Sequence, residues 1–130
     1  KTVDWSKRDK QYIIAIKTLY EQLWASEKPI RITTSLLGKR LGIIANLERH
    51  LEQLPITKRL LEQITESVEQ FQIRRCCRII DNLKNESSDV KLWRVQRLAG
   101  IKSKDFKTIR SILEAYLQEG GIDEKQRYKT

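Results

Sequence analysis

The chain has 130 residues, enough for one compact domain or for two very small units that share an element. Its 26 Lys and Arg outnumber 17 Asp and Glu, a formal net charge of +9 that attracts polyanions. No apolar run approaches the roughly 20 residues that span a bilayer, and no signal-peptide pattern is present, so we expect a cytoplasmic protein that contacts no membrane. The sequence contains no methionine and begins with lysine, so we expect part of a longer protein.

The first predicted helix spans residues 5–25. Its apolar side chains fall three and four residues apart, which is typical of an amphipathic helix, and Pro29 lies beyond its end. Asp4 is a favourable N-cap, because a carboxylate can accept hydrogen bonds from the free N–H groups of the first turn. Asp9 follows closely and suits the positive end of the same helix dipole.

A short helix and another amphipathic helix follow, separated by Gly42. Thr33 or Thr34 caps the short helix, which ends at Gly42 because glycine adopts the left-handed conformation without steric cost. The next helix is predicted to end before Pro55. Its apolar side consists of Ile43, Ile44, Leu47, Leu51 and Leu54.

The longest uninterrupted apolar pattern lies over residues 57–86, a stretch that contains neither Gly nor Pro. A continuous helix of that length would span about 40 Å, and we expect it to connect two units. The pattern ends at the polar sequence Asn-Glu-Ser-Ser-Asp.

The second half of the chain is predicted to form two further helices separated by Gly100. Ser87 or Ser88 caps the first of them, and the second begins at Ser103 or Asp105. The apolar residues expected to pack inward include Trp93, Val95, Leu98, Phe106, Ile109 and Ile112. We therefore expect a first unit over 1–56, a connecting helix over 57–86, a second unit over 87–119 and a flexible tail over 120–130.

An internal echo relates the two units. Gly-Lys-Arg-Leu-Gly-Ile at 38–43 and Val-Gln-Arg-Leu-Ala-Gly-Ile at 95–101 each close a short helix before another amphipathic helix begins. This order predicts an all-α fold with tandem helix-turn-helix units joined by the long helix. The second copy has apolar residues six and nine positions after its glycine, as that motif requires. The first copy fits less well, because its sixth position is Glu48 and its apolar residues are Leu47 and Leu51, so we expect its turn to be one residue tighter.

Four segments resemble the C-terminal region of the TnsD/TniQ family of transposon target-site selectors. They are VDWSKRD at 3–9, RITTSLLGKRLG at 31–42, LPITKRLLEQITESVEQFQIRR at 54–75 and LWRVQRLAGI at 92–101. The resemblance implies a bacterial, nucleoid-associated protein that binds a chromosomal attachment site, in that family the downstream end of the glucosamine-phosphate synthase gene. It further implies that the full-length protein recruits the transposon's AAA+ ATPase. The family's N-terminal zinc-binding part has no counterpart in this sequence.

Two outward helix faces are candidates for reading bases in double-stranded DNA. Arg can make bidentate hydrogen bonds to guanine, and Asn or Gln to adenine, so such side chains one turn apart are typical of a reading helix. An ordinary solvated helix face is the alternative for both, and Glu48 and Glu52 favour it at the first. The first face comprises Asn46, Arg49, His50 and Gln53, and the second Lys107, Thr108, Arg110 and Ser111.

A second set of residues is predicted to hold phosphates without reading sequence. The hydroxyl residues begin a helix whose free N–H groups favour an anion, although simple capping also explains them. These candidates are Thr33, Thr34, Ser35, Lys39, Arg40, Lys91, Arg94, Arg97, Lys102, Ser103 and Lys104.

Other classes of function have less support in the sequence. We expect neither a metal nor a cofactor, because the adjacent Cys76 and Cys77 and the single His50 provide no zinc ligand set. An enzyme is not predicted, since there is no glycine-rich phosphate loop, carboxylate pair or nucleophile with a base. The competing interpretation is a helical protein-interaction adaptor, or a nonspecific polyanion- or RNA-binding module.

Overall fold

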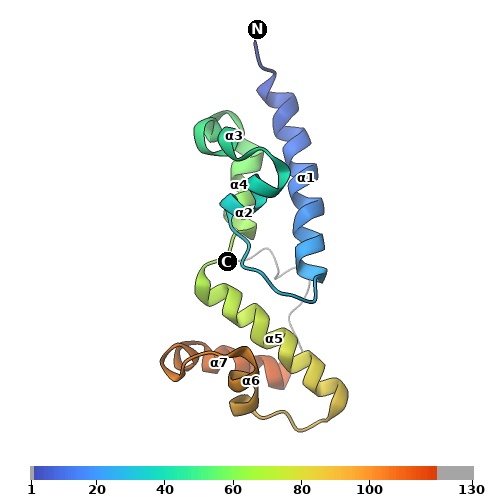
Figure 1. Cartoon of the computed structure of the whole chain (residues 1–130), viewed down its shortest axis with the longest axis vertical. Coiled ribbons are helices and arrows are strands. Elements are labelled where there is room, and N and C mark those ends of the chain that lie inside the picture. Colours follow the sequence, from blue (N-terminus) through green and yellow to red (C-terminus); the bar gives the residue numbers. More distant parts are fainter. Residues whose placement is uncertain (1, 120–130) are drawn as a thin grey trace. The chain divides into compact units, whose positions relative to one another are not determined.

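The computed structural model describes residues 2–119, and the predicted tail over 120–130 lies outside this range. The described residues form seven α-helices, one short 3-10 helix and no strand, which confirms the all-α fold (Figure 1). They divide into two compact units with the boundary between Glu66 and Ser67. None of the helices in this range is long and apolar enough to cross a membrane.

Unit 1, up to Glu66, begins with a helix whose limits the sequence predicted. Its elements are α1 (Trp5–Ala25), α2 (Thr34–Leu41), α3 (Ile44–Arg49), the 3-10 helix η1 (Leu51–Gln53) and α4 (Pro55–Ile64). The Asp4 side chain caps α1 by accepting a hydrogen bond from the Lys7 N–H at 3.0 Å. The core of the unit is apolar and includes Ile16, Tyr20, Ile32, Leu37, Leu47, Leu54 and Leu61.

Asp9 has a different role from the one expected, because its carboxylate caps α4 rather than its own helix. The side chain is only 3% exposed and accepts hydrogen bonds from the N–H groups of Ile56 at 3.0 Å and Thr57 at 2.8 Å. The Thr57 hydroxyl donates to the same carboxylate at 2.6 Å. Burial acts to raise the Asp9 pKa, but these three hydrogen bonds together outweigh it and leave the pKa below its usual value. Asp9 therefore fastens α1 to the start of α4.

The described part of unit 2, from Ser67 to Glu119, consists of three helices. They are α5 (Val68–Glu86), α6 (Leu92–Ala99) and α7 (Ser103–Glu119). Their common core includes Cys76, Ile80, Val95, Phe106, Ile109 and Leu113. At its edge the Tyr116 hydroxyl donates to the Asp81 carboxylate at 2.9 Å, which ties α7 to α5.

The single connecting helix predicted over 57–86 is in fact two helices, α4 and α5. Thr65 and Ser67 have extended backbones, and the Ser67 side chain and Gln70 form a reciprocal capping box that starts α5. Glu66 between them exchanges backbone and side-chain hydrogen bonds with Ile32, which draws the chain away from a helical path. The spacing of apolar residues does not reveal this break, because intervals of three and four residues continue from α4 into α5. The prediction of one continuous helix over residues 57–86 is therefore wrong.

Candidate nucleic-acid interface

The first glycine turn closes α2 with a pair of hydrogen bonds known as a Schellman motif. Gly42 has φ of 72°, its N–H donates to the Lys39 carbonyl at 3.3 Å, and the Ile43 N–H donates to the Gly38 carbonyl at 2.8 Å. A Cβ at Gly38 would lie 2.9 Å from the Ile44 Cα, so glycine is needed for α3 to approach this closely. The next helix begins two residues after Gly42, one residue sooner than in the second unit, as the sequence predicted.

The second turn repeats this cap with different supporting contacts. Gly100 has φ of 66°, and the N–H groups of Gly100 and Ile101 donate to the carbonyls of Arg97 and Gln96 at 3.2 and 3.3 Å. The Gln96 side chain spans the turn, donating to the Ile101 carbonyl and to the Ser103 hydroxyl, both at 3.2 Å. This side chain fixes where α7 begins relative to α6.

Arg75 of α5 supports the same turn from the other side. Its guanidinium donates to the Ala99 carbonyl at 2.9 Å and to Gln72 at 2.7 Å. A cation at the C-terminus of α6 also offsets the negative end of that helix dipole. The turn of unit 2 is therefore held by side chains from α5 and α6 together.

The predicted reading face of α7 is exposed. Phe106 and Ile109 are buried beneath it, so the opposite side of the helix faces solvent. Arg110 forms an ion pair with Glu114 at 3.0 Å, and the Thr108 hydroxyl donates to the Asp105 carbonyl at 2.7 Å. All four predicted base-reading residues here, Lys107, Thr108, Arg110 and Ser111, are exposed, as are Lys102, Ser103 and Lys104 at the start of the helix.

The predicted reading face of unit 1 is not one continuous helical surface. The helix expected from Gly42 to Pro55 ends at Arg49, and a separate 3-10 helix follows. The break lets Leu54 become fully buried while Pro55 starts α4 under the Asp9 cap. Two of the four predicted residues therefore lie outside α3: His50 at its C-cap and Gln53 in η1.

Contacts inside unit 1 already occupy three of these four side chains. Asn46 is half-buried and donates to the Tyr12 hydroxyl at 2.7 Å. The His50 ring lies 4.7 Å from the Trp5 ring, between centroids, and 3.1 Å from the Gln53 side-chain oxygen. Arg49 is exposed. The Trp5 ring therefore packs against the His50 ring within unit 1.

The candidate phosphate residues of unit 1 surround the start and end of α2. Thr33 is the N-cap and accepts the Leu36 N–H at 3.1 Å, so its capping role is established by geometry. Thr34 is half-buried. The remaining three, Ser35, Lys39 and Arg40, are exposed.

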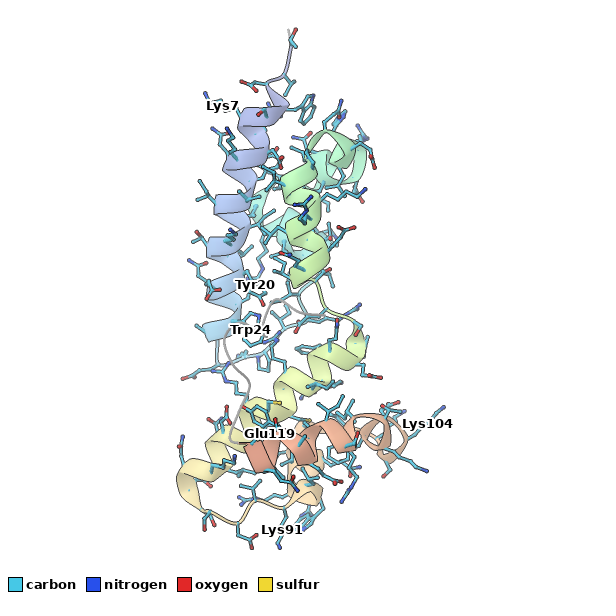
Figure 2. All side chains as sticks on the ribbon, turned by 180° about the vertical axis from the view of Figure 1, so that it is seen from behind. Lys7, Tyr20, Trp24, Lys91, Lys104 and Glu119 are labelled. Carbon is cyan, nitrogen blue, oxygen red and sulfur yellow. The ribbon has the colours of Figure 1, made fainter. Side chains whose placement is uncertain are left out.

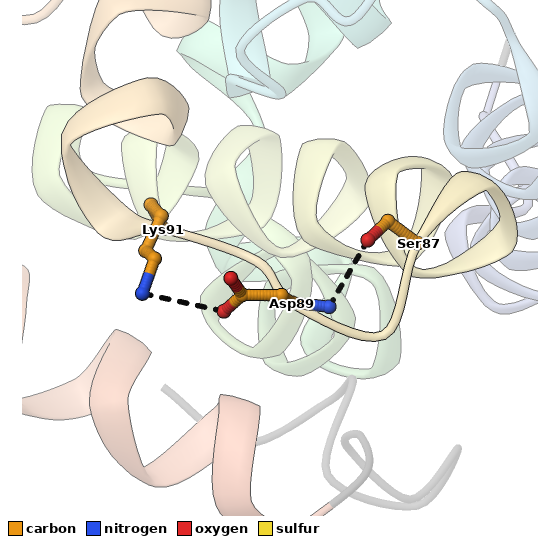
Figure 3. A network of polar contacts seen from close by, with 3 residues as sticks. All are labelled: Ser87, Asp89 and Lys91. Atoms are coloured by element: carbon orange, nitrogen blue, oxygen red, sulfur yellow. Dashed lines mark hydrogen bonds and ion pairs between the residues drawn. The ribbon is translucent and has the colours of Figure 1, made fainter.

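The candidate phosphate residues of unit 2 line α6 and the turn after it. Lys91 pairs with Asp89 at 3.4 Å, and the Asp89 N–H donates to the Ser87 hydroxyl at 3.2 Å (Figure 3). Figure 2 shows Lys104 projecting from the N-terminal end of α7, away from the core of the unit. Arg94 and Arg97 are exposed on α6. No acidic residue occurs between Val90 and Lys104, and within that stretch five Lys and Arg side chains are exposed.

Sequence reasoning misplaced three apolar side chains of unit 2. Trp93 is 60% exposed, Leu98 is 54% exposed and Ile112 is 43% exposed, although all three were expected in the core. The helix α6 instead buries Leu92, Val95 and Ala99, which are spaced by three and four residues. That spacing was available in the sequence, and it places Trp93 on the solvent side.

The two cysteines lie in the core of unit 2. Burial raises the pKa of Cys76 to about 11 and that of Cys77 to about 12, so both thiols stay protonated near neutral pH. Over residues 2–119, no three His, Cys, Asp or Glu side chains gather where they could hold a metal ion.

Comparison with known proteins identifies a matching family model and a relative of this chain. A family model described as TnsD, Tn7-like transposition protein D, matches residues 1–61. The chain is also 33% identical over 97 residues to the transposon Tn7 transposition protein TnsD of Escherichia coli, covering 75% of this chain. The match includes 19% of that relative, so the chain spans about a fifth of its length. No solved structure matches the chain.

Proposed function

This chain is TnsD-like, and we propose that it binds double-stranded DNA chiefly through unit 2. In this proposal α7 enters the major groove and α6 lies along the phosphate backbone, as in helix-turn-helix proteins. The observation that carries it is the set of exposed basic side chains from Lys91 to Lys104, a stretch without acidic residues that directly precedes an exposed polar helix face. Such a surface attracts a polyanion, and the helix behind it is long enough to reach base edges.

The proposed base-reading residues of α7 differ in what they can recognise. Lys107 and Arg110 would donate to guanine, and the Thr108 and Ser111 hydroxyls can donate or accept. The ion pair of Arg110 with Glu114 is exposed on both sides, and pairs of this kind contribute about 1 kcal/mol at most, so DNA can displace it.

The proposed phosphate contacts on this unit come from the turn and from α6. Lys91, Arg94, Arg97, Lys102, Ser103 and Lys104 would set the register of the protein on the duplex without reading sequence.

We assign unit 1 a supporting role on the DNA. The exposed Ser35, Lys39 and Arg40, with the helix start at Thr33 and Thr34, would contact phosphates. Of the first reading set, Arg49 is the most available for a base, because Asn46, His50 and Gln53 would each have to leave a contact within the unit. Unit 1 would therefore add affinity and little sequence preference.

The biological role that we propose is target-site selection in transposition. The relative is named as a transposition protein, and the resemblance described above implies an attachment site at the downstream end of the glucosamine-phosphate synthase gene. Recruitment of a transposon AAA+ ATPase would belong to the full-length protein.

Binding of a labelled duplex, measured by fluorescence anisotropy, tests this function. The duplex should carry the downstream end of the glucosamine-phosphate synthase gene, with a scrambled duplex and a double-stranded RNA of equal length as competitors. We expect preference for the gene-derived duplex, and neutralisation of about six phosphates gives a slope of log K against log salt near −5. Equal competition by all three nucleic acids would instead indicate a nonspecific polyanion binder. Absence of binding would favour a protein-interaction adaptor.

A further inference from the structure

Trp93 is the most exposed large apolar side chain in the described part of unit 2, with 60% of its surface accessible. Its surroundings are cationic: the Arg97 guanidinium lies 5.9 Å from the indole ring centroid, and Arg94 is the next residue along the chain. An aromatic surface beside two arginines, in a stretch from Val90 to Lys104 that contains no acidic residue, fits a ligand that has both phosphate and apolar parts.

The position of Trp93 on α6 relates it to the start of α7. Gln96 lies three residues after Trp93 and therefore on the same side of the helix. Because the Gln96 side chain donates to the Ser103 hydroxyl at 3.2 Å, that side of α6 faces the first residue of α7. Trp93 thus lies one helical turn further along the surface that begins at the N-terminus of α7.

We propose that Trp93 is a DNA-contacting residue that packs on the sugar–phosphate backbone at the edge of the groove entered by α7. The indole N–H donates to a phosphate oxygen, and the ring covers a deoxyribose. Arg97 neutralises the neighbouring phosphate while staying beside the ring. This inference rests on the proposed function. It adds to that function an apolar contact, which a Lys or Arg side chain could not provide.

Tryptophan emission and acrylamide quenching, measured with and without the gene-derived duplex, test this contact. Trp5 and Trp24 are only partly exposed, so the quenchable emission should come mainly from Trp93. We expect the duplex to protect that emission, and Trp93→Phe to remove the protected component. Trp93→Ala should weaken binding about tenfold, the loss of one buried hydrogen-bonded contact. It should leave the salt slope unchanged, whereas Arg97→Ala should reduce that slope by about one.

Leu98→Ala is the matched control, because Leu98 is a 54% exposed apolar residue on another side of the same helix. We expect it to bind the duplex as the wild type does. If the duplex binds but leaves Trp93 emission and quenching unchanged, and Trp93→Ala keeps wild-type affinity, the inference is wrong while the proposed function stands. If the wild-type chain binds no duplex, the proposed function fails, and the inference fails with it. In either case the exposed indole would instead be available to a protein partner.

Discussion

The two units share the same glycine turn, but the helices that follow the turn differ in length. In each, a helix of eight residues ends at a left-handed glycine with the same pair of capping hydrogen bonds. The helix that follows has 6 residues in unit 1 and 17 in unit 2. In α7 the apolar residues continue at helical spacing from Phe106 to Tyr116, so nothing ends the helix early. In unit 1, α4 instead begins at Pro55, and the Asp9 carboxylate accepts hydrogen bonds at its first turn.

The support beneath each turn differs in the same way. Unit 1 relies on the absence of a side chain at Gly38, which lets the backbones of α2 and α3 approach closely. Unit 2 relies on polar side chains, Gln96 across the turn and Arg75 beneath it. The local sequence therefore determines the turn, while packing around it determines how much helix is left to face a ligand.

The largest loss of stability should come from Asp9→Ala, which removes the side-chain cap of α4 in unit 1. Three hydrogen bonds to a buried carboxylate would be lost, and the free energy of unfolding of this unit should fall by about 3 kcal/mol or more. Thermal unfolding followed by circular dichroism would measure the loss. Asp4→Ala, which removes an exposed cap on α1, is the control and should cost about 1 kcal/mol.

The same carboxylate predicts a pH dependence that Asp9→Ala should abolish. Because the Asp9 pKa is lower in the folded than in the unfolded state, its contribution to stability is complete above the unfolded pKa, about 3.9. That contribution is lost as the pH falls through the lower, folded-state pKa. An equal acid sensitivity of the wild type and the variant would show that Asp9 is not the group responsible.

Gly38→Ala and Gln96→Ala, each four residues before its turn glycine, should separate the two kinds of support. The added Cβ would meet the Ile44 backbone at 2.9 Å, and overpacking of this kind costs about 1 to 3 kcal/mol. Gln96→Ala loses only partly exposed hydrogen bonds and should cost about 1 kcal/mol or less. Urea unfolding of both variants measures the difference, and equal losses would contradict the distinction between the two turns.

The sequence was sufficient for features that depend on neighbours along the chain. The limits of α1, the Asp4 cap and both turn glycines follow from local spacing and steric freedom. The break at Ser67 also had a local signal, since a serine followed three residues later by glutamine before an apolar run is a capping box. Reading the apolar period alone concealed that signal.

Other features required the tertiary structure. The partner of Asp9 is 48 residues away, so nothing near Asp9 in the sequence distinguishes a cap for α4 from a charge near its own helix start. Tyr12 and Trp5 of α1 contact Asn46 and His50, so these two candidate residues are already engaged within the unit. Surface position on a helix is predictable from spacing, but whether a polar side chain there is already engaged depends on elements that pack against it.

Variants of the two candidate reading faces should affect DNA binding more strongly in unit 2 than in unit 1. Arg110→Ala should relax preference at one base position by about 1 to 3 kcal/mol, the value of a bidentate contact. Arg49→Ala should have a smaller effect, and Lys39→Ala should weaken all sequences alike. Anisotropy titrations against single-base variants of the duplex would measure each effect. Wild-type specificity and affinity in both arginine variants would rule out the base-reading assignments.

Small effects on stability should also come from the turn glycines themselves, and here the two units should agree. A Cβ at Gly42 or Gly100 meets no atom within 4 Å, so alanine would add only the strain of a positive φ, about 1 kcal/mol at each site. Because both glycines make the same pair of capping bonds, Gly42→Ala and Gly100→Ala should lower stability by similar amounts in denaturant unfolding. The effect on DNA should differ, since Gly100 sets the position of α7 while Gly42 precedes a helix with few available reading residues. A greater loss of duplex affinity for Gly42→Ala would reverse the roles that we assign to the two units.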